Sequence, residues 1–221
     1  MSQSSREAIL SRIRRVAADP AGRIGDYTRI PRDYRRSGAL DGVAKLDLFL
    51  DRLKDYGAKT PFSRPESVAD TIAATLSARS LPGLVIPAGF PESWLPPGFN
   101  VVRDAALSYE EIDHCSGVLT TCAGAIASTG TIILRDQAPG QGRRALSLIP
   151  DYHLCVVRQS QIVETVPEAF SVLKTGQTVA VTTISGPSAT SDIEMTRIKG
   201  VHGPRTLEVI VVLDVFEDST R

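Results

Sequence analysis

Apolar residues recur at helical spacing near the start of the chain. In SREAILSRIRRV (residues 5–16) they fall on one side of a helix with 3.6 residues per turn. Ser4 followed by Glu7 forms a capping box before this stripe, and Asp19-Pro20 is a stop signal after it. The pattern predicts a first helix, whose apolar positions are Ile9, Leu10, Ile13 and Val16.

Two more helices are predicted before the pattern changes. One covers residues 40–56 and ends at Gly57, which can adopt the left-handed conformation. The next starts at Pro65, a favourable first helical residue. Residues 21–38 mix Arg, Tyr, Gly and Pro without a period, which predicts an extended arm. That arm is either a surface linker or a segment that embraces a partner protein.

From residue 83 onward, short runs of Val, Ile and Leu alternate with helical segments. Such near-continuous apolar runs are typical of strands in a parallel sheet, which are buried on both faces. The expected strands are 83–87, 117–120, 131–135, 153–158, 178–184 and 208–215, and the expected helical segments are 122–128, 164–174 and 191–198.

This alternation predicts an α/β fold with three layers, α/β/α, and a mainly parallel sheet joined by right-handed crossovers. The N-terminal helices would form an appendage on it. We expect the N-terminal helices and extended arm to occupy residues 1–58 and the α/β domain to occupy residues 59–221.

Composition narrows the function classes. The formal net charge is +0, with 25 basic and 25 acidic residues, so nothing indicates the basic stripe of a nucleic-acid-binding protein. No run approaches the ~18 apolar residues of a membrane span, and the N-terminus does not resemble a signal peptide. Three cysteines without a C-x-x-C pair fit a reducing compartment. These features predict a cytoplasmic protein.

The stretch GPSATSDIEMTRIKGVHGP (residues 186–204) lies between two predicted strands and carries most of the candidate chemistry. Ser191 and Glu194 make a capping box, so a helix is expected to begin there. A helix N-terminus at the carboxyl edge of a sheet attracts anions. We therefore expect an anion or substrate site with Gly186, Ser188, Thr190 and Glu194. The alternative is a well-capped helix without a ligand.

Two residues of this stretch are candidates for acid–base chemistry. Asp192 lies in the first turn of the expected helix, and His202 is flanked by Gly203 and Pro204. A histidine held in such a loop can act as a general base or orient a substrate oxygen. The structural alternative for His202 is a histidine that is hydrogen-bonded inside a turn.

Two further segments are candidates for anion or substrate binding. Thr129, Gly130 and Thr131 lie at a junction between expected elements, where the alternative is a helix stop with a left-handed glycine. Arg143 follows Gly140 and Gly142 in a glycine-rich loop, and its guanidinium can hold a carboxylate or phosphate with two hydrogen bonds. The alternative there is a solvated basic loop.

Other known motifs are absent from the sequence. It contains no phosphate-binding P-loop and no G-x-S-x-G nucleophile elbow. The spacing of its His and Cys residues matches no standard zinc pattern and supports no iron–sulfur ligation in this chain. We therefore expect no metal and no cofactor in this chain; the residues considered were His114, Cys115, Cys122, His153 and Cys155.

Three segments, in this order and spacing, resemble the LUD domain family, and within it the lactate utilization protein C (LutC, YkgG) branch. They are GVLTTCAGAIASTGTIIL, GQGRRALSLIPDYHLCVV and GPSATSDIEMTRIKGVHGP. The resemblance covers roughly residues 60–215. It implies a fold similar to the ribose-5-phosphate isomerase and coenzyme A transferase-like superfamily.

The resemblance also implies a role in oxidising L-lactate to pyruvate. The implied partners are two iron–sulfur lactate utilization proteins, LutA-like and LutB-like, which would carry the clusters. The chain departs from the family at Ser128, where the family usually has a glutamate. Three hypotheses follow: a binding and assembly subunit, a stand-alone enzyme that uses Asp192 and His202, and a nucleotide or coenzyme A binder.

Overall fold

The structure is a computed structural model that describes residues 5–17, 29–79, 81, 83–173, 179–190, 198–200 and 202–215. The chain divides into two compact units, Met1–Arg35 and Arg36–Arg221. In the first unit, helix α1 covers Ser5–Ala17 and carries exposed Ile9 and Ile13. This helix confirms the prediction from the apolar stripe.

The second unit contains the remaining elements. Its α-helices are α3 (Gly42–Asp55), α4 (Val68–Ser77), α5 (Tyr109–Asp113) and α6 (Val166–Val172). Short 3-10 turns are η1 (Pro65–Ser67), η2 (Glu92–Trp94), η3 (Arg144–Ser147) and η4 (Gln159–Gln161). The strands are β1 (Phe62–Ser63), β2 (Leu84–Ile86), β3 (Val101–Arg103), β4 (Gly117–Thr121), β5 (Gly124–Ile126), β6 (Thr131–Arg135), β7 (Tyr152–Arg158), β8 (Ile162–Val163), β9 (Val181–Ile184), β10 (Ala189–Thr190), β11 (Ile198–Lys199) and β12 (Thr206–Val212).

A six-stranded sheet, in the order β1-β12-β7-β4-β2-β3, forms the centre of this unit. Every pairing in it is parallel. Strands β7 and β12 make its longest ladder, with Tyr152 opposite Thr206 and Arg158 opposite Val212. The prediction of an α/β fold with a parallel sheet is therefore confirmed. The strands of this sheet are covered on both faces, and this explains the continuous apolar runs in the sequence.

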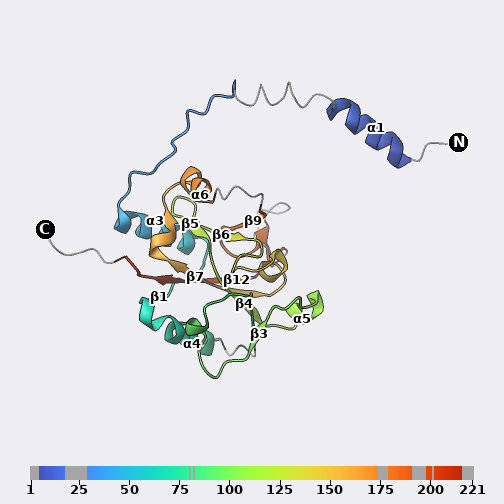
Figure 1. Ribbon diagram of the computed structural model, residues 1–221. Helices are drawn as coiled ribbons and strands as arrows, with labels where there is room; N and C mark the ends of the chain where they lie inside the picture. The colour runs from blue at the N-terminus through green and yellow to red at the C-terminus, as the bar shows by residue number, and fades with distance from the viewer. Residues whose placement is uncertain are drawn as a thin grey trace. The chain divides into compact units, whose positions relative to one another are not determined.

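Different layers cover the two faces of the large sheet (Figure 1). Helix α4 packs Val68, Ile72 and Leu76 on one face, against residues that include Leu154 and Ile210. On the opposite face lie helix α3 and a second sheet of four strands, in the order β8-β5-β6-β9. Helix α6 packs on this second sheet. The predicted α/β/α layering is thus modified, because the second sheet occupies much of one face.

The segment 122–128 explains this difference. It was expected to form a helical turn, but it contains strand β5, which pairs antiparallel with β6 and parallel with β8. Ala125, Ile126 and Ala127 are all buried, so no amphipathic period marks the strand. Small residues bring β5 close to the core of the large sheet. Helix α6 confirms the helix that was expected over 164–174.

Candidate functional site

The glycine-rich stretch begins at the end of β9, where Gly186 has φ +86°. A Cβ atom at this position would lie 2.6 Å from Cβ of Tyr56, the residue that ends helix α3. Only glycine combines this backbone conformation with so close a contact. Gly186 therefore fixes where the stretch leaves the second sheet.

Hydrogen bonds then join the two ends of the stretch. The Ser188 N–H donates to Pro204 O at 2.8 Å, and the Gly200 N–H donates to Ser188 O at 2.9 Å. The Ser188 hydroxyl accepts a hydrogen bond from the backbone N–H of His202 at 3.1 Å. Ser188 therefore contacts His202 directly.

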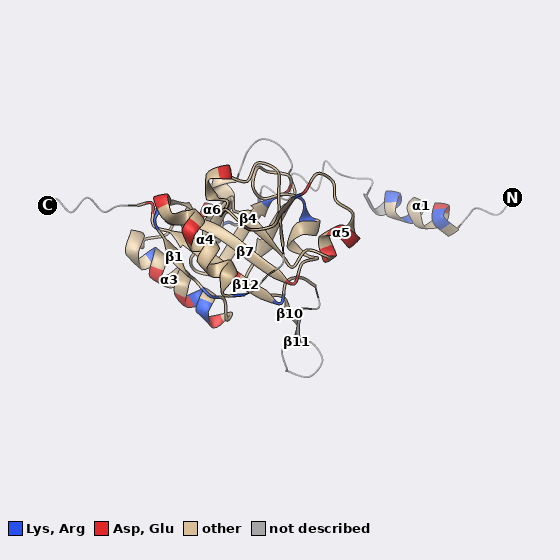
Figure 2. Ribbon diagram, turned by 90° about the horizontal axis from the view of Figure 1, so that it is seen from below, with Lys and Arg blue, Asp and Glu red and all other residues tan. Residues whose placement is uncertain are grey.

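Strands β10 and β11 continue from this junction as an antiparallel pair, with Ala189 opposite Lys199 (Figure 2). Thr190 belongs to β10, and its side chain is not described. Asp192 and Glu194 lie outside the described residues, as does most of the helix expected over 191–198. Their proposed roles stay predictions.

The stretch reaches a different edge of the sheet than expected. Strand β9 belongs to the second sheet, and His202 and Gly203 lead into the start of β12. His202 therefore lies at the amino-terminal end of a parallel strand. The expectation of a pocket at the carboxyl edge was wrong, because the sequence did not show that β9 lies outside the large sheet.

A hollow of about 410 Å³ opens beside His202. It contains two basic side chains, Arg144 and His202, and one acidic side chain, Asp151. Arg205 lies 3.4 Å from Asp151, so this carboxylate already has a cationic partner. Within residues 29–190 and 198–215 as far as they are described, no hydrogen bond or ion pair engages the exposed His202 ring or the Arg144 guanidinium, so both could contact a small anion. Leu148, Ile149, Gly200 and Gly203 complete the lining.

Thr129 and Thr131 belong to a chain of hydroxyl groups. The Thr131 hydroxyl lies 2.7 Å from that of Thr129 and 2.8 Å from that of Ser185. Thr131 is buried, so its hydroxyl joins the start of β6 to the end of β9. Gly130 has φ +58° and approaches Arg52 on helix α3. Gly130 thus has the left-handed conformation of the structural alternative, but it lies in the turn between β5 and β6 and not at the end of a helix.

Arg143 lies in another part of the molecule and has partners of its own. Its guanidinium makes two hydrogen bonds of 2.9 Å to the Asp104 carboxylate and another to Leu107 O. The hydrogen bond to Asp104 raises the pKa of Arg143. An external anion would compete with Asp104 for this guanidinium. The hollow that Arg143 lines contains neither Ser188 nor His202.

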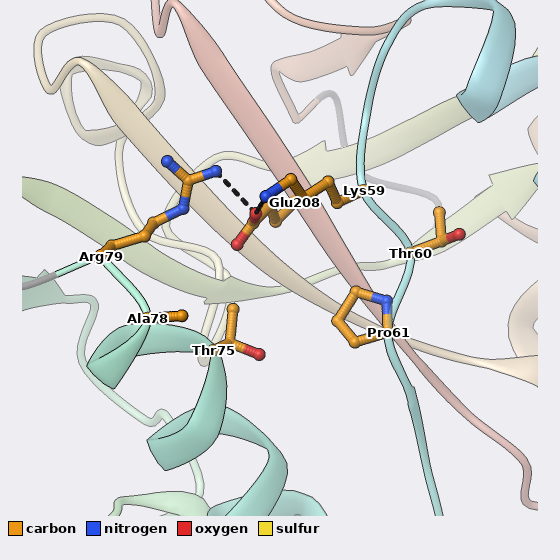
Figure 3. A pocket seen from close by; sticks show the side chains of 7 residues that line it. All are labelled: Lys59, Thr60, Pro61, Thr75, Ala78, Arg79 and Glu208. Atoms are coloured by element: carbon orange, nitrogen blue, oxygen red, sulfur yellow. Dashed lines mark hydrogen bonds and ion pairs between the residues drawn. The ribbon is translucent and has the colours of Figure 1, made fainter.

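A cluster around Glu208 on β12 was not predicted from the sequence (Figure 3). Its Oε1 atom accepts a hydrogen bond from Arg79 Nη2 at 2.6 Å, and its Oε2 atom accepts one from the Tyr152 hydroxyl at 2.8 Å. Lys59 Nζ lies 3.8 Å from Oε1. The sequence did contain one signal, the charged Glu208 inside the apolar run LEVIVV. Charged residues are almost never buried without partners, so a buried partner of Glu208 could have been expected.

Electrostatics keep this cluster in one protonation state near neutral pH. Burial would raise the pKa of Glu208, but the hydrogen bonds from Arg79 and Tyr152 outweigh it and lower the pKa. Burial and the hydrogen bond to Glu208 raise the pKa of Tyr152. The carboxylate therefore stays ionised and the phenol stays protonated.

Among the described residues, no group of three or more His, Cys, Asp and Glu side chains could hold a metal ion. Cys122 and Cys155 are both buried. The hydrogen bond with Cys155 and burial raise the pKa of Cys122, which keeps its thiol protonated and unreactive. None of the described helices is long and apolar enough to cross a membrane.

Comparison with known proteins gives consistent matches. The LUD domain family matches residues 89–212. A lactate utilization protein C of Deinococcus radiodurans is 50% identical over 171 residues, which are 76% of this chain and 79% of the relative. YkgG of Escherichia coli is 32% identical over 124 residues, 52% of each chain.

A solved structure supports the fold. It is the crystal structure of a DUF162 family protein from Deinococcus radiodurans, 44% identical in sequence. Its TM-score is 0.67, and the match covers 79% of this chain and 99% of that chain.

Proposed function

The chain belongs to the LUD domain family and is a homologue of lactate utilization protein C, and from this premise we propose that it is a subunit of a system that oxidises L-lactate to pyruvate. The observation that carries the proposal is the 50% identity over 79% of the Deinococcus relative. The proposed partners are two iron–sulfur proteins, LutA-like and LutB-like. The proposed setting is the cytoplasm.

In this proposal electron transfer belongs to the partners. The described residues provide no ligand cluster for a metal, and the thiol of Cys122 is protonated and buried. The contribution of this chain is then to bind a small carboxylate and to assemble with the partners. The finer fold assignment, to the ribose-5-phosphate isomerase and coenzyme A transferase-like superfamily, is part of the same proposal.

The hollow beside His202 is the proposed carboxylate site. Arg144 supplies a permanent positive charge, and the imidazole of His202 supplies a hydrogen-bond donor beside it. The bond from the His202 N–H to Ser188 limits the movement of this loop. We place Asp192 and Glu194 in the same site on the basis of the sequence motif alone.

The test is reconstitution of dye-linked L-lactate oxidation from the purified chain and cluster-loaded partners. We expect activity only when all three proteins are present. Full activity of the partners without this chain would overturn the proposed role. Activity of the chain alone would instead identify it as an enzyme.

A matched pair of variants locates the site within the reconstituted system. His202→Asn should lower the rate at low L-lactate concentration while the chain still co-purifies with its partners. His114→Asn is the control, because His114 is an exposed histidine at the end of helix α5. Equal rates for both variants would remove His202 from the carboxylate site.

A further inference from the structure

A second hollow, of about 390 Å³, lies at the amino-terminal edge of the large sheet (Figure 3). It is bounded by the start of β12, the end of helix α4 and the extended residues that precede β1. None of its lining residues belongs to the hollow beside His202. The lining is formed by Lys59, Thr60, Pro61, Thr75, Ala78, Arg79 and Glu208.

The charged groups of this hollow do not cancel. Lys59 and Arg79 carry two positive charges, and the lowered pKa of Glu208 gives one negative charge. Tyr152, whose hydroxyl donates a hydrogen bond to Glu208 but which does not line the hollow, stays neutral. The hollow therefore carries one excess positive charge, which favours a singly charged anion.

Both basic side chains have hydrogen-bonding capacity left. The Lys59 side chain is 77% exposed, and its Nζ lies 3.8 Å from Glu208, beyond a good hydrogen bond. The Arg79 guanidinium has five N–H donors, of which Nη2 bonds Glu208, and its side chain is 25% exposed. The Lys59 ammonium and the exposed part of this guanidinium can therefore donate hydrogen bonds to a carboxylate.

Glu208 adds a requirement that a bare anion does not meet. A carboxylate offers about four acceptor positions, and Arg79, Tyr152 and Lys59 approach only part of them. A ligand that brings only negative charge is repelled by Glu208. One that also brings a hydroxyl group can donate a hydrogen bond to it.

The remaining wall of the hollow is largely apolar. Figure 3 shows Pro61 and Ala78 across from the charged groups, with Thr75 beside Ala78. The Thr75 hydroxyl already donates to Thr71 O at 2.8 Å, so it offers no free donor here. This wall suits a short alkyl group.

We propose that this hollow binds a small hydroxy acid. Its carboxylate lies between Lys59 and Arg79, its hydroxyl donates to Glu208, and its alkyl group packs on Pro61 and Ala78. The proposal stands independently of the role in lactate oxidation, because it requires only binding to the isolated chain.

Isothermal titration of the full chain tests this with three probes: L-lactate, propionate and inorganic phosphate. Propionate matches L-lactate except for the hydroxyl group. We expect L-lactate to bind at least about tenfold more tightly than propionate, because a site that accepts a ligand hydroxyl rejects an analogue without one. Phosphate should also bind more weakly than L-lactate. Equal binding of all three would show a site selective for charge alone and would overturn the proposal.

Two substitutions decide whether binding occurs in this hollow. Ala78→Leu fills it from an exposed position, so we expect loss of the L-lactate binding that belongs to this hollow, with a folded protein, while binding at the hollow beside His202 remains. Lys59→Gln should weaken binding by about tenfold, because it removes one charged hydrogen bond. Lys54→Gln, an exposed lysine on helix α3, is the matched control and should leave affinity unchanged.

The proposal is wrong if wild-type chain binds no L-lactate, or if Ala78→Leu and Lys59→Gln bind it as the wild type does. Binding that survives these substitutions but disappears in His202→Asn would assign the ligand to the other hollow. The titrations contain no partner protein. Their outcome therefore does not decide whether the chain is needed for L-lactate oxidation, which the reconstitution experiment tests by itself.

Discussion

Replacing Arg79 by methionine should destabilise the fold by removing the main partner of Glu208. Glu208 lies on a central strand with a side chain that is 4% exposed, and its 2.6 Å bond to Arg79 is its shortest. Methionine preserves much of the apolar contact with the Tyr152 ring but removes the charge. The carboxylate would then be buried beside Tyr152 and a more distant Lys59.

The magnitude follows from how completely the pair is buried. Removing one partner of a fully buried ion pair costs ~3–5 kcal/mol. The Arg79 side chain is 25% exposed and Lys59 remains, so we expect a loss of about 2–3 kcal/mol. Urea unfolding followed by circular dichroism measures this loss from the shift of the midpoint.

Arg103→Met is the matched control. Arg103 pairs with Glu92 at 2.7 Å, but their side chains are 53% and 70% exposed, so its loss should lower the free energy of unfolding far less than Arg79→Met does. A double variant, Arg79→Met with Glu208→Gln, should lose less than the two single changes together, because the unpaired charge is gone. Equal losses of unfolding free energy in Arg79→Met and Arg103→Met would show that Arg79 does not stabilise the fold through the buried Glu208.

Three further predictions concern other parts of the molecule. Gly130→Ala should lower the free energy of unfolding by ~1–3 kcal/mol, because φ is +58° and the new Cβ would lie 2.6 Å from Arg52 Cβ; Gly42→Ala, which meets no atom within 4 Å, should not lower it. Burial lowers the pKa of His153 to about 4, so the unfolded state binds the proton first and stability should fall as the pH drops from ~6.5 to about 4; urea midpoints of His153→Gln should show a flatter dependence, and an unchanged one would contradict this. In the reconstituted system, Ser188→Ala should raise the KM for L-lactate by about three- to tenfold, since the His202 N–H loses its acceptor; an unchanged KM would separate this bond from binding.

The sequence patterns predicted those strands whose burial is uniform. The run 153–158 became β7, and the run 208–215 contains most of β12, because a strand covered on both faces shows a continuous apolar run. Strand β5 gave no such signal. Its small residues fit equally well into a helical turn, and only the neighbouring β6 and β8 select the extended form.

The candidate site was predicted in part. Ser188 and His202 belong to one motif, so their contact could be expected from their short separation in the sequence. Arg79 and Glu208 are 129 positions apart, and they meet because helix α4 packs on the face of β12 that carries Glu208. A single sequence contains no local signal for such a pairing.

The place of β12 in the large sheet has a consequence for biosynthesis. Among the described strands it is the last in chain order, yet it lies between β1 and β7. Within that sheet β1 pairs only with β12, so the first strand to be synthesised cannot pair until the last one has been made. While the ribosome is still making the chain, β7 presents an unpaired edge rich in Val and Leu. We therefore expect the growing polypeptide to depend on chaperone protection until β12 has left the exit tunnel.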